Sequence, residues 1–125
     1  MQSYVHRVNY YETDKMGITH HSNYIRFMEE ARMALLRDAG FPMTRLEQLG
    51  ITSPVVSVSC EYRHTTTFDD DIQVEVSVTG YTGVRLSLHY DMRNLADGTL
   101  AASADSVHCF ISHDGRPVQV RKFCP

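Results

Sequence analysis

The chain has 125 residues, a length that suits a single domain with its own hydrophobic core, and we expect one domain over residues 1–125. Hydrophobic residues make up 42% and charged residues 22%, which excludes a disordered or low-complexity chain. The 12 Lys and Arg residues against 15 Asp and Glu residues give a net charge of −3, which argues against general binding to nucleic acids or anionic membranes.

The spacing of cysteines and histidines predicts neither a disulfide framework nor a bound metal. The three cysteines form no Cys-x-x-Cys pair, and the scattered histidines lack the spacing of metal ligands. The acidic run at residues 69–71 precedes a predicted strand, which favours a solvated turn over a metal site. The N-terminal segment lacks the apolar stretch of a signal peptide, and no run approaches the roughly 20 apolar residues of a membrane span. We therefore expect a cytoplasmic protein.

The first predicted elements are a strand over residues 5–11 and a long helix over residues 22–39. The helix is indicated by apolar residues that recur every three or four positions, with charges between them. Ser22 is the expected N-cap, because its hydroxyl can accept a hydrogen bond from the first turn. Gly40 is the expected residue after the C-terminus, and Pro42 prevents the helix from resuming. A short second helix is expected over residues 44–49.

The rest of the chain alternates with a period of two, which predicts strands over residues 56–63, 72–79, 84–93 and 99–112. Turn signals separate them. Cys60 alternates with valines that we expect in the core, so its thiol is expected to be buried. The small residues at 101–104 leave room for something large to lie across the sheet. One helix on one face of an antiparallel sheet is an α+β fold, and its open edges predict self-association.

The segment between the first strand and the long helix places acidic and basic groups at a helix N-terminus. Asp14, Gly17, His20 and His21 lie within this short loop. Free N–H groups at a helix start can polarise a carbonyl, and a nearby carboxylate can act as nucleophile or general base. By residue chemistry alone, an acid that closes a turn or caps the helix is the more common role for Asp14, and a surface loop position the more common one for His20.

Residues 11–24, YETDKMGITHHSNY, resemble the signature of hotdog-fold acyl-CoA thioesterases of the 4-hydroxybenzoyl-CoA thioesterase type. That signature is an acid at the end of the first strand, a glycine three residues later, and a His-x-Asn-Tyr entry to the central helix. Residues 62–72, YRHTTTFDDDI, resemble the family's passage between the second and third strands, and the order of elements agrees. The YbgC-like branch is the most similar. Met16, His64 and Thr65 depart from the family's pattern, which leaves the substrate open.

The resemblance implies a hotdog fold, a long antiparallel sheet wrapped around one central helix. It also implies dimers joined edge to edge at the sheets, often paired into tetramers, with active sites at the interface. Asp14 falls on the family's catalytic carboxylate, and His21 on the position whose backbone N–H holds the thioester carbonyl oxygen. The substrate is an acyl-CoA, and no cofactor is implied, since coenzyme A is part of the substrate.

We expect the substrate to be bound by Gly17, Asn23, Tyr24, Met28 and Arg63. For Tyr24 and Met28, core packing explains the same helical stripe equally well. Glu29 is a candidate for contact with a polar group on the acyl chain. The alternative is a solvated charge on the outer side of the helix. The candidate partners of the CoA phosphates are basic: Arg63, Arg85, Arg121 and Lys122.

Two other functions stay open from the sequence. A hotdog hydratase or dehydratase also acts on a thioester, but usually with a differently placed pair of acidic and histidine residues. A non-catalytic hotdog protein binds acyl-CoA or a partner protein, and needs no acid beside the thioester carbonyl. Asp14 together with Gly17 and His21 favours the thioesterase.

Overall fold

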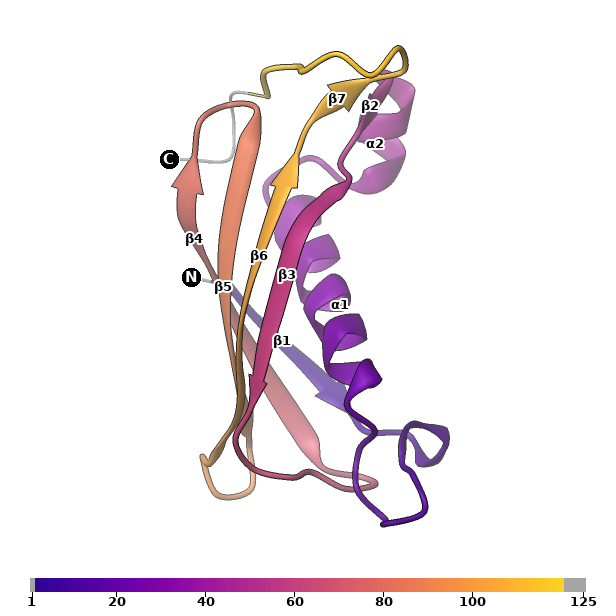
Figure 1. Ribbon diagram of the computed structural model, residues 1–125, viewed down its shortest axis with the longest axis vertical. Coiled ribbons are helices and arrows are strands. Elements are labelled where there is room, and N and C mark those ends of the chain that lie inside the picture. The colour runs from indigo at the N-terminus through magenta and orange to yellow at the C-terminus, as the bar shows by residue number, and fades with distance from the viewer. Residues whose placement is uncertain (1, 121–125) are drawn as a thin grey trace.

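The protein is built on one antiparallel sheet that curves around a central helix, and the computed structural model describes residues 2–120 (Figure 1). The strand order is β1-β4-β5-β6-β3. The five strands are β1 (Gln2–Arg7), β3 (Val55–Tyr62), β4 (Asp71–Tyr81), β5 (Arg85–Asn94) and β6 (Leu100–Cys109). The helix α1 (Ser22–Asp38) lies along one face, where it contacts β1 and β4. The predicted α+β architecture, a long antiparallel sheet with one main helix, is confirmed.

Beyond one end of α1, a short helix and a small ribbon extend the fold. The helix α2 (Met43–Gln48) confirms the predicted second helix to within one residue at each end. The ribbon pairs β2 (Ile51–Thr52) with β7 (Ile111–Ser112).

None of the helices among the described residues is long and apolar enough to cross a membrane.

The core lies between α1 and the concave face of the sheet. Alternate residues of the central strands point into it and are buried: Ile72, Val74, Val76, Leu86, Leu88, Tyr90, Met92, Ala102 and Ala104. From the helix, Phe27, Met28, Ala31 and Leu36 meet them. Ala104 stands opposite Tyr90 in the register of β5 and β6, so the small residues of β6 lie beside the largest fully buried side chain of β5.

The first strand ends sooner than predicted. β1 covers Gln2–Arg7, and a single 3-10 turn covers Tyr10–Glu12. The Glu12 carboxylate accepts a hydrogen bond from the Asn9 backbone N–H at 2.7 Å, which closes the turn. Tyr10 and Tyr11 are of a residue type that is common in strands, but they lie in the 3-10 turn with exposed side chains. Asp14 therefore follows a capped turn instead of a strand end.

The helix α1 has the predicted extent but not the predicted cap. It begins at Ser22, and His21 is its N-cap residue, without a capping hydrogen bond from the side chain. The Ser22 hydroxyl is hydrogen-bonded to His20 Nδ1 at 2.8 Å instead, so the N-cap assignment to Ser22 was wrong. At the other end, Gly40 has φ +88° and the Phe41 N–H donates to the Leu36 carbonyl, which confirms Gly40 as the residue after the cap.

The third strand differs from the prediction in its burial. β3 is an edge strand, and its alternating valines are about half exposed, at 46% for Val56 and 45% for Val58. Cys60 is only half-buried. The alternation correctly predicted a strand, but the inference that these valines fill the core was wrong, because β3 lies at the sheet edge and is paired on one side only, with β6, within the described chain.

The last predicted strand is broken at Phe110. β6 ends at Cys109, and β7 then pairs with β2 instead of the main sheet. Phe110 is fully buried between the two strands, and its backbone N–H donates to the Val84 carbonyl. The inward turn of the chain at Phe110 therefore separates β6 from β7, which the sequence pattern predicted as one strand.

Candidate active site

The loop that leads into α1 forms a compact hairpin around Asp14. Thr13 and Thr19 are bridged, and the Asp14 N–H donates to the Ile18 carbonyl at 2.9 Å. The Gly17 N–H closes the turn on the Asp14 carbonyl at 2.9 Å, with Gly17 at φ +77°. A residue with a Cβ is strained at that φ, so glycine suits this turn. The hairpin holds the Asp14 side chain at one position in front of the helix.

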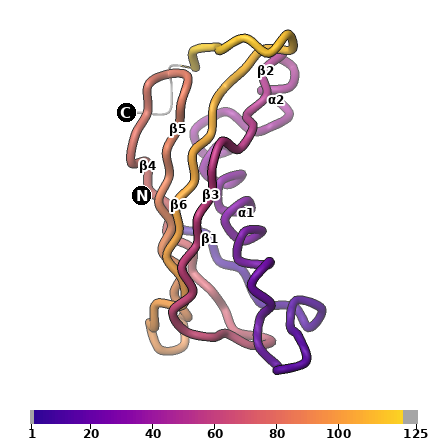
Figure 2. Tube along the Cα trace, in the orientation of Figure 1, coloured from indigo at the N-terminus to yellow at the C-terminus, as the bar shows by residue number. Residues whose placement is uncertain are grey.

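A buried cluster of hydroxyl groups anchors this hairpin to the opposite connection between β3 and β4. The Thr19 N–H donates to the Thr66 carbonyl at 2.8 Å, and their hydroxyls are 2.7 Å apart. The Tyr24 hydroxyl lies 2.8 Å from the same Thr66 oxygen. Figure 2 shows the two connections at the same end of the molecule as the start of α1. The hairpin, the helix and the β3–β4 connection are thereby fixed relative to one another.

The start of α1 presents a free N–H donor next to the hairpin. The Asn23 N–H donates to the His20 carbonyl and the Tyr24 N–H to the His21 carbonyl. Within residues 2–120 the backbone N–H of His21 itself makes no hydrogen bond. Such a donor at a helix N-terminus, with the positive end of the helix dipole behind it, is suited to an oxygen that carries negative charge.

Asp14 and His21 line the same pocket, of about 370 Å³. Its other walls are mainly apolar and come from the hairpin, from α1 and from the end of β3: Met16, Ile18, Thr19, Tyr24, Tyr62 and Thr65. The Tyr62 hydroxyl donates to the His21 carbonyl at 3.3 Å, which places the end of β3 against the helix start. A carboxylate and a free N–H therefore open into one largely apolar space.

The two Asp14 carboxylate oxygens are in different situations. Oδ1 accepts the Met16 N–H at 2.8 Å. Oδ2 makes no hydrogen bond within the described residues, and the side chain is half-buried. One oxygen is thus held in place and the other is free to meet a substrate or a water molecule.

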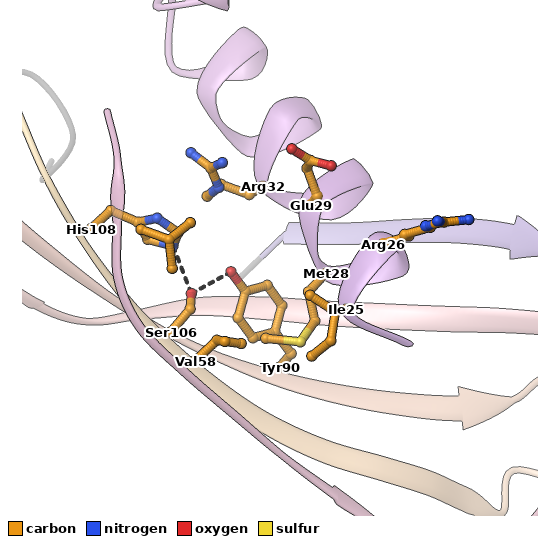
Figure 3. A pocket seen from close by; sticks show the side chains of 10 residues that line it. Ile25, Arg26, Met28, Glu29, Arg32, Val58, Tyr90, Ser106 and His108 are labelled. Carbon is orange, nitrogen blue, oxygen red and sulfur yellow. Dashed lines mark hydrogen bonds between the residues drawn. The ribbon is translucent and has the colours of Figure 1, made fainter. Parts of the chain in front are cut away.

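A second pocket, of about 320 Å³, lies further along α1, between this helix and β3, β5 and β6 (Figure 3). Met28 lines it together with Ile25, Val58 and Tyr90. Met28 follows Tyr24 by one helical turn, and Val58 precedes Tyr62 by four strand residues, so the two pockets follow one another along the α1–β3 groove. Its charged and polar lining residues are Arg26, Glu29, Arg32, Ser106 and His108, of which Arg26 and Glu29 are exposed.

The remaining predicted substrate-binding residues lie elsewhere around the site. Asn23 is buried, and its amide donates to the Glu12 and His20 carbonyls, so it ties the 3-10 turn to the helix. Gly17 shapes the turn. Arg63 is exposed and paired with Glu61 at 2.9 Å, outside the residues that line the Asp14 pocket. Arg85 is exposed. Arg121 and Lys122 lie outside the described residues. Contact of these groups with substrate stays a prediction.

Thr19, Thr66 and Tyr62 are site residues that sequence reasoning missed. Thr66 lies inside the second motif, residues 62–72, but nothing in that motif singles it out, and its partners Thr19 and Tyr24 are far away in the chain. Tyr62 begins that motif and was expected in a strand, but no contact with the start of the helix was predicted for it; in the structure it ends β3 beside His21. Over residues 2–120, the structure brings together no group of three or more acidic, histidine or cysteine side chains that could hold a metal ion.

Comparison with known proteins identifies the class to which this fold and site belong. The sequence pattern of the thioesterase-like superfamily matches residues 8–124, nearly the whole chain. The chain belongs to this family. The predicted hotdog fold and the predicted class of enzyme, a thioester hydrolase, are thereby confirmed.

Individual relatives agree with this class. The chain is 36% identical over 119 residues to YneP of Bacillus subtilis, a proposed acyl-CoA thioesterase, covering 94% of this chain and 86% of YneP. It is 29% identical over 99 residues to the acyl-CoA thioester hydrolase YbgC of Escherichia coli, covering 79% and 73%. The crystal structure of the DHNA-CoA thioesterase of Staphylococcus aureus superposes with a TM-score of 0.88 at 28% identity, covering 94% of this chain and 79% of that one. Acyl-CoA thioesterase activity is thus supported at the level of the family.

Proposed function

We propose that this protein hydrolyses an acyl-CoA thioester to a free acid and coenzyme A, with Asp14 as the catalytic carboxylate. The observation that carries the proposal is the shared pocket of Asp14 and the start of α1. Asp14, which has one unpaired carboxylate oxygen, and His21, whose N–H is unpaired within the described residues, line one largely apolar pocket. Acyl transfer needs both groups, one to attack or activate the attacking water and one to stabilise the oxyanion.

In this mechanism the thioester carbonyl oxygen accepts the His21 backbone N–H. Asp14 then acts in one of two ways. It attacks the carbonyl carbon and forms an acyl anhydride that water hydrolyses, or it removes a proton from a water molecule that attacks directly. In both routes the carbon–sulfur bond breaks, CoA leaves as its thiolate, and water supplies the oxygen of the acid. The Met16 N–H on Asp14 Oδ1 keeps the carboxylate oriented throughout.

The shape of the groove supports an acyl group that lies along α1. From the carbonyl at the helix start, an acyl chain follows the apolar wall past Tyr24 and Tyr62 to Met28. The CoA part then extends outward past the exposed hairpin residues around Asp14, where Lys15 lines a shallow surface depression. Because CoA carries phosphates, we expect exposed basic residues to meet it there, Lys15 and Arg63 among them.

We also infer that the protein works as a homodimer or homotetramer. The edge of β3 offers unpaired backbone groups, and exposed valines flank them on both faces. Long edges with apolar side chains favour pairing with another strand. A second copy along β3 would lie beside both pockets. The cytoplasmic location stays a prediction.

The direct test is thiol release from a panel of acyl-CoAs by the wild-type protein and by Asp14→Asn. The amide cannot act as nucleophile or general base, so we expect kcat to fall by about 10²- to 10⁴-fold. Circular dichroism verifies that the variant is folded. Asp97→Asn, in the exposed turn between β5 and β6, is the matched control and retains full activity.

Three other outcomes decide between the alternatives. Near wild-type turnover by Asp14→Asn would show that another group is catalytic. Binding of acyl-CoA by the wild-type protein without thiol release from any panel member favours the non-catalytic binding protein. A product that gains or loses water while CoA remains attached favours the hydratase or dehydratase.

A further inference from the structure

The second pocket has an apolar end and a polar end, and the polar end is incompletely paired. Figure 3 shows Met28 and Ile25 toward one end, with the exposed Arg26 beside them, and Arg32 with His108 toward the other. Arg32 is only 6% exposed and His108 only 2%. Groups of this kind are seldom buried without partners.

Arg32 is a buried cation without a counter-ion in the described chain. Its Nη1 is buried and has no hydrogen-bond partner, and within residues 2–120 Arg32 forms no ion pair with a carboxylate. Glu29, one turn earlier on α1, is exposed; it lines the same pocket and its charge acts to raise the pKa of Arg32, but it forms no ion pair with the guanidinium. Burial lowers the pKa of Arg32, but a guanidinium keeps its charge at neutral pH. A buried charge without an ion-pair partner is unfavourable, so this position favours an anion that contacts Nη1 directly.

His108 adds a second unmatched group beside Arg32. Its Nε2 lies 2.7 Å from the Ser106 hydroxyl, which in turn lies 2.6 Å from the Tyr90 hydroxyl. Burial and the nearby Arg32 charge lower the pKa of His108 to about 4, so the ring is neutral at pH 7. When Tyr90 donates to Ser106 and Ser106 donates to Nε2, the ring proton is on Nδ1. That atom is buried and has no partner.

We propose that Arg32 and His108 bind an anionic oxygen at the far end of the acyl group, a carboxylate or a phenolate. This inference rests on the proposed function, because it takes the α1–β3 groove as the acyl site. The apolar wall formed by Met28, Val58 and the Tyr90 ring carries the hydrocarbon part. The planar guanidinium then supplies two parallel N–H donors, which match the two oxygens of a carboxylate.

The distance along the helix sets the length of the acyl group. Arg32 follows His21 by 11 residues, which is about 16 Å along the axis. Helical side chains lean toward the N-terminus, so the guanidinium lies closer to the carbonyl site than its Cα does. An acyl group of medium length with a terminal carboxylate suits this span better than a short one. Dodecanedioyl-CoA is therefore the probe, and dodecanoyl-CoA is its partner without the terminal charge.

The experiment compares kcat/KM for the two probes in the wild-type protein, in Arg32→Met and in Arg37→Met. Methionine keeps the apolar stem and removes the charge. Arg37 is on the same helix but exposed, so Arg37→Met is the matched control. We expect the preference for dodecanedioyl-CoA over dodecanoyl-CoA to fall by about 10- to 100-fold in Arg32→Met, as for the loss of a charged hydrogen-bonded pair, and to stay unchanged in Arg37→Met. Arg32→Lys keeps the positive charge but lacks the two parallel N–H donors of the guanidinium, so we expect its loss of preference for dodecanedioyl-CoA to be intermediate.

A binding measurement without turnover separates this inference from the proposed function. The free diacid, dodecanedioic acid, should raise the melting temperature of the wild-type protein more than dodecanoic acid does, and Arg32→Met should abolish that difference. If neither ester is hydrolysed but the diacid still stabilises through Arg32, the thioesterase proposal fails and the anion site stands. If both esters are hydrolysed with the same preference in Arg32→Met as in the wild type, the anion site is refuted and the thioesterase stands.

The anion on Arg32 has one competing source, Glu29 of a second copy packed on the same groove. In that case Glu29→Gln and Arg32→Met would both shift the protein to a smaller species in light scattering, and both would lower the hydrolysis of the two esters equally. That result would overturn the proposal. The proposal instead expects Arg32→Met to keep the wild-type mass and to lose only the preference for the charged acyl group.

Discussion

The helix α1 has a buried polar cluster on each side, and the two clusters differ in how their charges are matched. On the β1 side, His6 lies between two carboxylates, 2.8 Å from Glu12 and 2.9 Å from Glu30, and the Tyr4 hydroxyl donates to Glu30 at 2.7 Å. On the β3 side, Arg32 has no carboxylate partner within the described chain.

The two histidines show the consequence of this difference. Burial alone lowers the pKa of His6, but hydrogen bonds to Glu12 and Glu30 raise it above the usual 6.5. Burial lowers the pKa of His108 to about 4, and the Arg32 charge acts in the same direction. The first cluster is complete and holds β1, the 3-10 turn and α1 together. The second is incomplete, and a buried group without a partner points to a ligand or a partner that supplies one.

The largest expected effect comes from breaking the complete cluster. Glu12→Ala removes the acceptor of both His6 and the Asn9 backbone N–H, and leaves buried donors unpaired. We expect a loss of about 3–5 kcal/mol in the free energy of unfolding, measured by urea denaturation. Glu61→Ala removes an exposed carboxylate paired with Arg63 and should cost less than about 1 kcal/mol. Similar losses for the two variants would mean that the cluster on the β1 side does not stabilise the fold.

The pH dependence of stability should have opposite slopes for the two histidines. Between pH 6.5 and about 4 the unfolded chain protonates His108 and the folded chain does not, so stability falls as the pH is lowered, by about 3 kcal/mol over the whole interval. His6 is the reverse case, since its raised pKa stabilises the fold fully below pH 6.5 and that contribution is lost as the pH rises through the folded value.

These two contributions are separated by urea unfolding at a series of pH values. His108→Gln should remove the loss of stability on the acidic side relative to the wild type. His6→Gln should remove the decline above pH 6.5. Identical slopes in the wild type and in His108→Gln would mean that the His108 ring is charged in the folded protein, contrary to its burial.

A smaller effect of opposite sign is expected when the unmatched charge is removed. Arg32→Met replaces a buried cation without a partner by an apolar side chain of similar length, so we expect a gain of about 1–3 kcal/mol in the free energy of unfolding of the ligand-free protein. Thermal and urea unfolding measure it. Destabilisation would show that Arg32 already has an anionic partner in the assembled protein, and the contrast between the two clusters would disappear.

The smallest effect is expected in a third histidine cluster, on the outer face of the sheet. His89 lies 2.8 Å from Asp105 and 3.1 Å from Asp91, in the same kind of arrangement as His6, but the Asp105 side chain is 63% exposed. Asp105→Asn should change the free energy of unfolding by less than about 1 kcal/mol, because water screens the pair. A loss as large as that of Glu12→Ala would mean that a partner subunit buries this face.

Local patterns in the sequence determined most of the secondary structure of this protein. The apolar period of α1, the glycine after its end and the alternation of the strands are encoded by residues close together in the chain, and they were read with small boundary errors. The loop around Asp14 was singled out because its acid, its glycine and the helix start are neighbours in sequence and resemble a family signature, whereas its hairpin shape was not predicted. Errors arose where one local signal had two readings, as with Tyr10 and Tyr11 in a 3-10 turn and Ser22 beside the helix cap.

Only the tertiary structure decided which distant residues meet. The exposure of β3 follows from its place at the sheet edge, and alternation along a strand does not specify how many neighbours that strand has. Thr66 joins Thr19 and Tyr24, and Arg32 shares a pocket with His108, through the packing of α1 on a sheet whose order differs from the order in sequence. Side-chain pairing across such separations depends on strand register and on helix position, which arise from the whole fold and leave no local pattern.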